Sequence, residues 1–224
     1  MFLKNRCKNY LKISIFFLIV FSSYGNCDWA EITLSEMSLE EKIGQLFIIP
    51  ACPKRGEDHL EEVKEILVKY HIGGIIVKHA KAEEQVRFLN QLQETSTIPL
   101  LIAADAEWGL GMRMENVISF PRNLTLGAIV DNHLIYLLGK EIGRQCKIVG
   151  IHLNLAPALD VNTNPMNPII HMRSFGDDPF VVSTKGIQLM KGVESAGVLS
   201  TAKHFPGHGD VSVDSHVALP LLAH

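Results

Sequence analysis

Residues 73–105 read GGIIVKHAKAEEQVRFLNQLQETSTIPLLIAAD, and their pattern decides the fold class of the chain. Residues 73–77 and 99–104 are short, continuous apolar runs, which are typical of strands buried on both faces. Residues 82–94 lie between them and carry apolar side chains at helical spacing. A strand, a helix and a second strand in this order predict a parallel βαβ unit.

The same alternation extends in both directions along the chain. Ser38 and Glu41 form a capping-box pair that predicts the start of the first helix. Further strands are expected at residues 47–50, 151–155 and 198–202, and further helices at 57–70, 132–149 and 181–196. Such alternation suits either an open doubly wound sheet or a (β/α)8 barrel. No glycine-rich phosphate loop follows the first strand, and the candidate reactive residues follow the third, fourth and fifth strands, so we favour the barrel.

The composition is that of a globular protein. The 224-residue chain has 47% hydrophobic residues, 20% charged residues and a formal net charge of -3. It carries no basic stripe, so we expect no nucleic-acid partner. Cys52 and Cys146 are far apart in the sequence, and we expect separate thiols rather than a disulfide. No zinc-type cysteine spacing is present, and we expect no metal or other cofactor.

Residues 1–27 have the layout of a secretory signal peptide. A basic head precedes the apolar run at residues 13–21, and small polar residues follow it. The run is about half of the roughly 20 residues that a membrane span needs, so an export signal is favoured over a membrane anchor. We therefore expect an exported bacterial protein, periplasmic or extracellular. Membrane contact is expected only through the signal or through a lipid on Cys27, and lipidation stays an open alternative.

One Lys, three His and two Asp lie at residues 203–216, directly after the last predicted strand. The glycines and proline of this stretch favour a fixed loop, and such a loop at the end of a barrel strand is a candidate site. Asp214 can orient the imidazole of His216, which could then act as a general acid and a general base. A solvated polar loop and a metal site made of His204, His208 and His216 are the alternatives. A Ser-His-Asp hydrolase is disfavoured, because no nucleophile-elbow sequence is present.

These motifs together resemble glycoside hydrolase family 3, in its N-acetyl-β-glucosaminidase branch. The matching stretches are IGQLF at 43–47, DAEWG at 105–109, MRM at 112–114, FP at 120–121, LG at 126–127, APALDVN at 156–162, RSFGDDP at 173–179, AKHFPGHG at 202–209 and DSH at 214–216. The resemblance covers about residues 35–224. The usual family pattern has Gln and Gly where Ala106 and Trp108 stand, so we expect the rim of the pocket to differ here.

The resemblance implies a (β/α)8 barrel of which about five βα units are present, and hydrolysis of terminal β-linked N-acetylglucosamine with retention of configuration. The residues that it implies for binding the sugar hydroxyls are Asp105, Arg173, Lys203 and His204. His216 would be the acid and base, held by Asp214, in place of the carboxylic acid that most retaining glycosidases use. A glycan or muropeptide that contains N-acetylglucosamine would be the substrate, in peptidoglycan turnover.

The resemblance leaves three further ionisable residues open. Glu107 and Arg113 could contact the sugar or only support residues that do. Asp160 could likewise brace its loop or touch the substrate.

A retaining glycosidase also needs a carboxylate nucleophile. The resemblance implies an Asp on a loop well past the fifth strand, and no matching position exists up to His224. A barrel of this kind typically has about 250 residues and eight strands, so we expect a truncated and inactive chain. A sugar-binding remnant and a glycoside phosphorylase on the same scaffold are the alternatives.

Overall fold

The computed structural model describes residues 29–222 of the chain. The chain consists of a short N-terminal unit that ends at Ile43 and a main unit that begins at Gly44. The short unit contains α2 (Trp29–Glu36), and α3 (Leu39–Gly44) ends at the boundary. The predicted capping box is confirmed. The Ser38 amide donates to Glu41 Oε2 at 2.7 Å, and the Glu41 amide donates to Ser38 Oγ at 3.2 Å.

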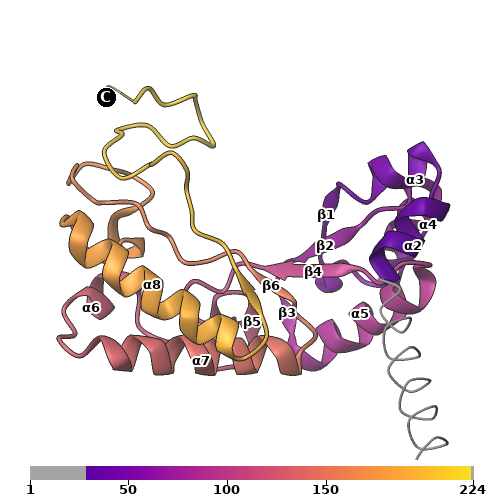
Figure 1. Cartoon of the computed structure of the whole chain (residues 1–224), viewed down its shortest axis with the longest axis horizontal. Coiled ribbons are helices and arrows are strands. Elements are labelled where there is room, and N and C mark those ends of the chain that lie inside the picture. Colours follow the sequence, from indigo (N-terminus) through magenta and orange to yellow (C-terminus); the bar gives the residue numbers. More distant parts are fainter. Residues whose placement is uncertain (1–28, 223–224) are drawn as a thin grey trace, which may run out of the picture. The chain divides into compact units, whose positions relative to one another are not determined.

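The main unit is built on one five-stranded parallel sheet (Figure 1). Its strands are β1 (Ile48–Ala51), β2 (Gly74–Val77), β4 (Leu101–Ala104), β6 (Leu153–Asn154) and β7 (Leu199–Ser200). Their order across the sheet, β1-β2-β4-β6-β7, is their order along the chain. A doubly wound sheet reverses direction at a switch point, whereas a barrel adds each strand next to the previous one. The parallel α/β prediction is therefore confirmed, and the strand order is that of a barrel.

The register of the sheet aligns the strands so that their carboxyl ends meet at one edge. Ile48 pairs with Gly74, and Gly74 pairs with Leu101. Leu153 pairs with Leu199 at the far side of the sheet. Since the loops that follow parallel strands leave from the same edge, the residues directly after β4, β6 and β7 are brought together.

Four long helices follow the strands, as predicted. They are α4 (Glu57–Tyr70), α5 (Ala82–Thr95), α7 (Asn132–Ile148) and α8 (Pro179–Ser195). Asp131 and Asp178 cap the last two by accepting hydrogen bonds from the backbone amides two residues on. The core between helices and sheet contains the fully buried Ile75, Leu92 and Ile102.

The structure also contains short elements that the sequence pattern did not predict. They are η1 (Pro53–Arg55), β3 (Ala80–Lys81), η2 (Leu110–Met112), β5 (Met114–Glu115), α6 (Asn123–Gly127) and η3 (His171–Arg173). The last of these lies in the long connection between β6 and α8. β3 and β5 form a separate two-stranded parallel sheet. Elements of two to five residues carry too little periodicity to be identified in the sequence.

The N-terminus and the cysteines were both subjects of sequence predictions. The predicted signal peptide and Cys27 lie outside the described residues and stay predictions. Among residues 29–222, no helix is both long and apolar enough to cross a membrane. Cys52 and Cys146 are free thiols. Burial raises the pKa of the Cys146 thiol to about 12.

Candidate active site

Asp105 and Glu107 follow β4 directly and place two carboxylates at the carboxyl edge of the sheet. Asp105 Oδ2 accepts a hydrogen bond from Arg113 Nη2 at 2.5 Å. Lys203, which lies three residues after β7, bridges the two carboxylates. Its Nζ lies 2.9 Å from Asp105 Oδ1 and 2.9 Å from Glu107 Oε1. Residues that are almost 100 positions apart in the sequence thus meet in one ion-pair network.

Arg173 joins this network from η3. Its Nε and Nη2 donate to the two oxygens of Glu107, at 2.9 and 2.7 Å, in a bidentate pair. The Glu107 side chain is 2% exposed, and that of Arg173 is 19% exposed. A bidentate pair at this depth fixes the guanidinium plane, so Arg173 can present its remaining edge in a defined direction.

His204 extends the network to Asp160. Its Nδ1 lies 2.6 Å from Asp160 Oδ2, and its Nε2 lies 3.2 Å from Arg173 Nη2. A guanidinium nitrogen can only donate, so Nε2 must be the acceptor. His204 is then a neutral imidazole whose Nδ1–H donates to Asp160. The contact with Arg173 would be lost if this ring were protonated on both nitrogens.

The network balances charge. Three carboxylates, those of Asp105, Glu107 and Asp160, stand against the three cations Arg113, Arg173 and Lys203. Burial alone would raise the pKa of each carboxyl group, but the cations and the imidazole outweigh it and hold all three pKa values below the usual range. Burial likewise opposes the charge of Arg173, and the paired Glu107 raises its pKa above the ordinary value.

Backbone contacts between the loops hold these side chains in place. Asn154, at the end of β6, accepts a hydrogen bond from the Ala106 amide at 3.0 Å and so fixes the turn that carries Glu107. The Lys203 amide donates to the Pro157 carbonyl at 3.1 Å, and the Lys203 carbonyl accepts from the Leu159 amide at 2.6 Å. The loops after β4, β6 and β7 are thereby joined to one another.

Asp160 also braces the loop that follows Lys203. Its Oδ1 accepts from the His208 amide at 2.8 Å. Gly209 packs against the Val161 carbonyl so closely that a Cβ there would lie 1.9 Å from the oxygen. In the structure, Glu107 holds Arg173 and Asp160 holds His204 and its loop. The sequence had left open whether these two carboxylates support other site residues or contact the sugar. Next to Asp160 and His204 lies a pocket of about 180 Å³.

Asp214 and His216 form the predicted pair on the last loop. Asp214 Oδ1 accepts from the His216 amide at 2.9 Å and lies 2.7 Å from His216 Nδ1. These two contacts, the backbone one first, lower the pKa of Asp214. The His216 side chain is 79% exposed. Within residues 29–222, no hydrogen bond or ion pair connects this dyad to the network around Arg173.

The six residues predicted for the site therefore fall into two groups. The structure brings together Asp105, Arg173, Lys203 and His204, and it pairs Asp214 with His216 without a described hydrogen bond or ion pair to the first group. Their roles toward a sugar stay predictions. Over the described part of the chain, no group of His, Cys, Asp and Glu side chains is arranged to hold a metal ion.

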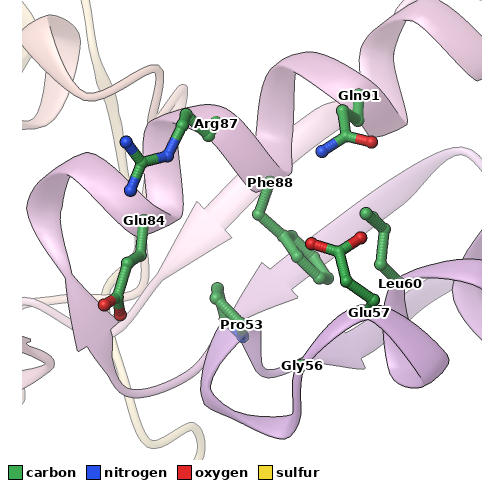
Figure 2. A pocket seen from close by; sticks show the side chains of 8 residues that line it. All are labelled: Pro53, Gly56, Glu57, Leu60, Glu84, Arg87, Phe88 and Gln91. Atoms are coloured by element: carbon green, nitrogen blue, oxygen red, sulfur yellow. The ribbon is translucent and has the colours of Figure 1, made fainter.

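A second pocket, of about 200 Å³, lies between η1, α4 and α5 (Figure 2). Phe88 of α5 points toward Pro53 and Leu60 in its centre, and the polar side chains of Glu57 and Arg87 are exposed. It contains none of the predicted site residues. We therefore place the candidate chemistry at the charged network.

Comparisons with known proteins point to one family. The family model described as "Glycosyl hydrolase family 3 N terminal domain" matches residues 38–224. The chain is 40% identical over 176 residues to Beta-hexosaminidase A of Pseudoalteromonas piscicida, a match that covers 73% of this chain and 29% of the relative. It is 31% identical over 189 residues to a Beta-N-acetylglucosaminidase/beta-glucosidase of Cellulomonas fimi, covering 84% of this chain and 33% of that protein.

Solved structures give the same result. A glycoside hydrolase family 3 beta-N-acetylglucosaminidase from Paenibacillus sp. str. FPU-7 superposes with a TM-score of 0.75 at 36% identity, over 82% of this chain and 36% of that one. A Beta-glucoside phosphorylase BglX bound to 2FGlc superposes with a TM-score of 0.78 at 31% identity, over 84% and 34% of the two chains. The chain thus spans about a third of the length of these relatives. The predicted barrel-type fold class is confirmed.

Proposed function

Because the chain belongs to glycosyl hydrolase family 3, we propose that it carries the sugar-binding and proton-transfer groups of an enzyme that hydrolyses terminal β-linked N-acetylglucosamine. The observation that carries the proposal is the convergence of Asp105, Arg173, Lys203 and His204 at the ends of three barrel strands. The names of the relatives, beta-hexosaminidase and beta-N-acetylglucosaminidase, support the choice of sugar.

In this proposal the charged network binds the hydroxyl groups of the terminal sugar. An ammonium group has three N–H donors. Two N–H donors of Lys203 reach Asp105 and Glu107 among the described residues, and the third is available for a sugar hydroxyl. Asp105 accepts from a second hydroxyl. Since the network is already charge-balanced and hydrogen-bonded, it is preorganised and little reorganisation is needed when a sugar binds.

Proton transfer is assigned to the Asp214–His216 dyad. Asp214 holds His216 through Nδ1, which directs Nε2 outward. In the first step a carboxylate attacks the anomeric carbon, the glycosidic C–O bond breaks, and His216 Nε2–H protonates the departing oxygen. In the second step the neutral imidazole takes a proton from water, whose oxygen attacks the anomeric carbon and releases the carboxylate. The attacking carboxylate is a further residue, because Asp105 and Glu107 are both held by cations.

The natural substrate and the location of the enzyme are also part of the proposal. The predicted export signal places the enzyme outside the bacterial cytoplasm, where glycans and muropeptides that contain N-acetylglucosamine occur. A role in peptidoglycan turnover follows from this location together with the sugar specificity. Digestion of purified peptidoglycan fragments, with detection of released N-acetylglucosamine, tests it.

The catalytic proposal is tested with the gene product that carries this sequence and a 4-nitrophenyl N-acetyl-β-glucosaminide. We expect no turnover from the 224-residue chain alone. Where this sequence is joined to a segment that supplies the carboxylate nucleophile, we expect turnover, and we expect His216→Ala to lower kcat by about 10²- to 10⁴-fold, the range for loss of a general acid and base. His133→Ala, at the start of α7 and outside both groups, is the control. Full activity of His216→Ala would contradict the assignment of the dyad.

Sugar binding is tested separately, because all four proposed binding groups lie in the described part of the chain. Calorimetry with N-acetylglucosamine and the 224-residue chain should show binding that Arg173→Ala abolishes. Absence of binding by the unaltered, folded chain would remove the sugar-binding role of the network.

Phosphorolysis is the second candidate, since the chain superposes on a beta-glucoside phosphorylase. In that reaction phosphate rather than water attacks in the second step. A neutral imidazole next to the anomeric carbon repels phosphate less than a carboxylate would. Release of a sugar 1-phosphate in phosphate buffer, and a slower reaction without phosphate, would favour phosphorolysis over hydrolysis.

A further inference from the structure

Asn167 is a buried asparagine just before η3, and the proposed function gives it no role. The residue is 2% exposed. Its Oδ1 accepts hydrogen bonds from the amides of Ile169 at 2.9 Å and Ile170 at 2.8 Å. Its Nδ2 donates to the carbonyls of His208 at 2.5 Å and Val211 at 2.9 Å. An asparagine side chain has two N–H donors and two lone pairs on its oxygen, so all of its hydrogen-bonding groups are used.

The oxygen and the nitrogen of this side chain cannot exchange places. Turning the amide over would set its NH₂ group against two backbone N–H groups, and its oxygen against two carbonyl oxygens. The oxygen therefore belongs to the side of η3, and the nitrogen to the side of the loop that follows Lys203 and His204. One buried side chain thus joins two segments that each carry residues of the charged network.

The oxygen side holds the short helix that carries Arg173. Ile170 is the N-cap residue of η3, and its carbonyl accepts from the Arg173 amide at 2.7 Å. At the other end of η3, the Arg173 carbonyl accepts from Asn123 Nδ2 at 2.7 Å, and Asn123 is also 2% exposed. A 3₁₀-helix of three residues has few hydrogen bonds of its own. Two buried asparagines therefore fix its backbone from both ends.

The nitrogen side holds the loop that carries His204. The His208 amide donates to Asp160 Oδ1 at 2.8 Å, and Asp160 Oδ2 lies 2.6 Å from His204 Nδ1. The His208 carbonyl is held by Asn167, so the loop is bonded both to Asp160 and to the start of η3. Arg173 Nη2 then meets His204 Nε2 at 3.2 Å, although the two residues are 31 positions apart in the sequence.

From this arrangement we propose that Asn167 is a positioning residue for the charged network. It sets the separation between Arg173 and His204, because it holds η3 through its oxygen and the His204 loop through its nitrogen. The contact from Arg173 keeps His204 Nε2 unprotonated and leaves the ring proton on Nδ1, toward Asp160. The effect of Asn167 on sugar affinity rests on the proposed function; its effect on the contact between Arg173 and His204 does not.

The test separates the two ends of the side chain. Asn167→Asp keeps both acceptor positions toward η3 and loses both donors toward the loop. Asn164→Ala is the matched control, because Asn164 Nδ2 donates to the carbonyls of Asp210 and Val211, and its side chain makes no bond to η3 among the described residues. The ring nitrogen resonances of His204, assigned with His204→Gln, report its tautomer in NMR spectra.

In the unaltered chain we expect a single His204 tautomer, protonated on Nδ1, and slow hydrogen exchange at the amides of Ile169 and Ile170. In Asn167→Asp these two amides should stay protected, whereas His204 should lose its single tautomer. A general loss of stability would instead expose the two amides together with the rest of the chain. Asn164→Ala should leave the His204 resonances nearly unchanged.

Three results would overturn the proposal. They are fast exchange of the two amides in the unaltered chain, an unchanged His204 tautomer in Asn167→Asp, and an equal change in Asn164→Ala. Should the aspartate prevent folding, Asn167→Ser takes its place, because serine is uncharged and too short to reach the loop carbonyls. It must then change the His204 tautomer in the same way.

Sugar affinity measures the consequence for the proposed function. In calorimetry with N-acetylglucosamine, Asn167→Asp should weaken binding by about 10- to 100-fold, the range for loss of a hydrogen bond to a charged group. Asn164→Ala should weaken it much less. Equal affinities of the unaltered chain and Asn167→Asp would contradict the positioning role. If the His204 tautomer changes as expected but the unaltered chain binds no N-acetylglucosamine, the positioning role stands and the proposed function fails.

Discussion

Glu107 is a buried carboxylate that holds two cations at once. It is 2% exposed, accepts two hydrogen bonds from Arg173 and lies 2.9 Å from Lys203 Nζ. Glu107→Gln would remove its charge, which leaves the partly buried Arg173 without its bidentate carboxylate and Lys203 with Asp105 as its remaining carboxylate partner. Because breaking a buried pair costs about 3–5 kcal/mol, we expect a loss of that size in the free energy of unfolding, measured in urea.

A matched control for this prediction lies on α7. Glu141 also makes a bidentate pair, with both contacts to Arg144 at 2.7 Å, but the two side chains are 38% and 58% exposed. Exposed pairs contribute about 0–1 kcal/mol, so Glu141→Gln should change the free energy of unfolding very little. If the two variants lose equal stability, the burial argument for Glu107 is wrong.

At the level of single residues, the sequence predicted which side chains carry charge at the site but not what each one contacts. Asp105, Arg173, Lys203 and His204 were predicted together from their motifs, and the structure brings them together. Whether Asp160 contacts a substrate or a neighbouring residue depends on which loops lie close together. A single sequence does not give the distances between loops. The burial of His208 was missed for the same reason, since its backbone is bonded to Asp160 and Asn167, which lie more than 40 positions earlier in the sequence.

At the level of elements, α7 and α8 pack through glycines. A Cβ on Gly192 would lie 2.2 Å from the Tyr136 carbonyl oxygen of α7, and one on Gly139 would lie 2.2 Å from the Leu189 carbonyl oxygen of α8. Gly192→Ala should lower the free energy of unfolding by about 1–3 kcal/mol through overpacking, despite the better helix propensity of Ala. The change in the urea midpoint measures this loss.

Gly186, six residues earlier on α8, provides the comparison. The three atoms nearest to a Cβ there all belong to the Leu159 side chain, with Cδ2 at 2.1 Å, and that side chain can rotate away. Gly186→Ala should therefore cost less than Gly192→Ala. A larger loss for Gly186→Ala would mean that the α7–α8 contact does not limit the packing.

Helices and strands were predicted correctly where the signal lies in residues that are close together in the sequence. α4 begins and ends at the predicted residues, and α7 and α8 differ by one or two, because apolar periodicity and capping residues are local. The fourth and fifth strands are shorter than predicted, two residues each, since pairing with a neighbour decides where a strand ends. β3 and β5 were missed because Ala80 and Met114 pair across a long stretch of sequence.

For the whole molecule, the same network that forms the candidate site makes stability depend on pH. The folded pKa values of Asp105, Glu107 and Asp160 lie below their ordinary values. The unfolded chain then binds more protons than the folded chain at acidic pH. The stabilisation is present above the unfolded pKa values of about 4 and is lost as the pH falls through the lower, folded values.

We therefore expect a urea midpoint that changes little between about pH 7 and pH 5 and falls steeply below about pH 4. Part of this slope comes from the surface, because hydrogen bonds from Arg144 and Gln145 lower the pKa of Glu141 to about 2. Salt at about 1 M screens that exposed pair but hardly reaches buried ones, so most of the slope should remain at high salt. Asp105→Asn removes one carboxylate of the network and should flatten the slope in both conditions. A slope that high salt abolishes, or that Asp105→Asn leaves unchanged, would assign the acid sensitivity to the surface of the molecule rather than to its site.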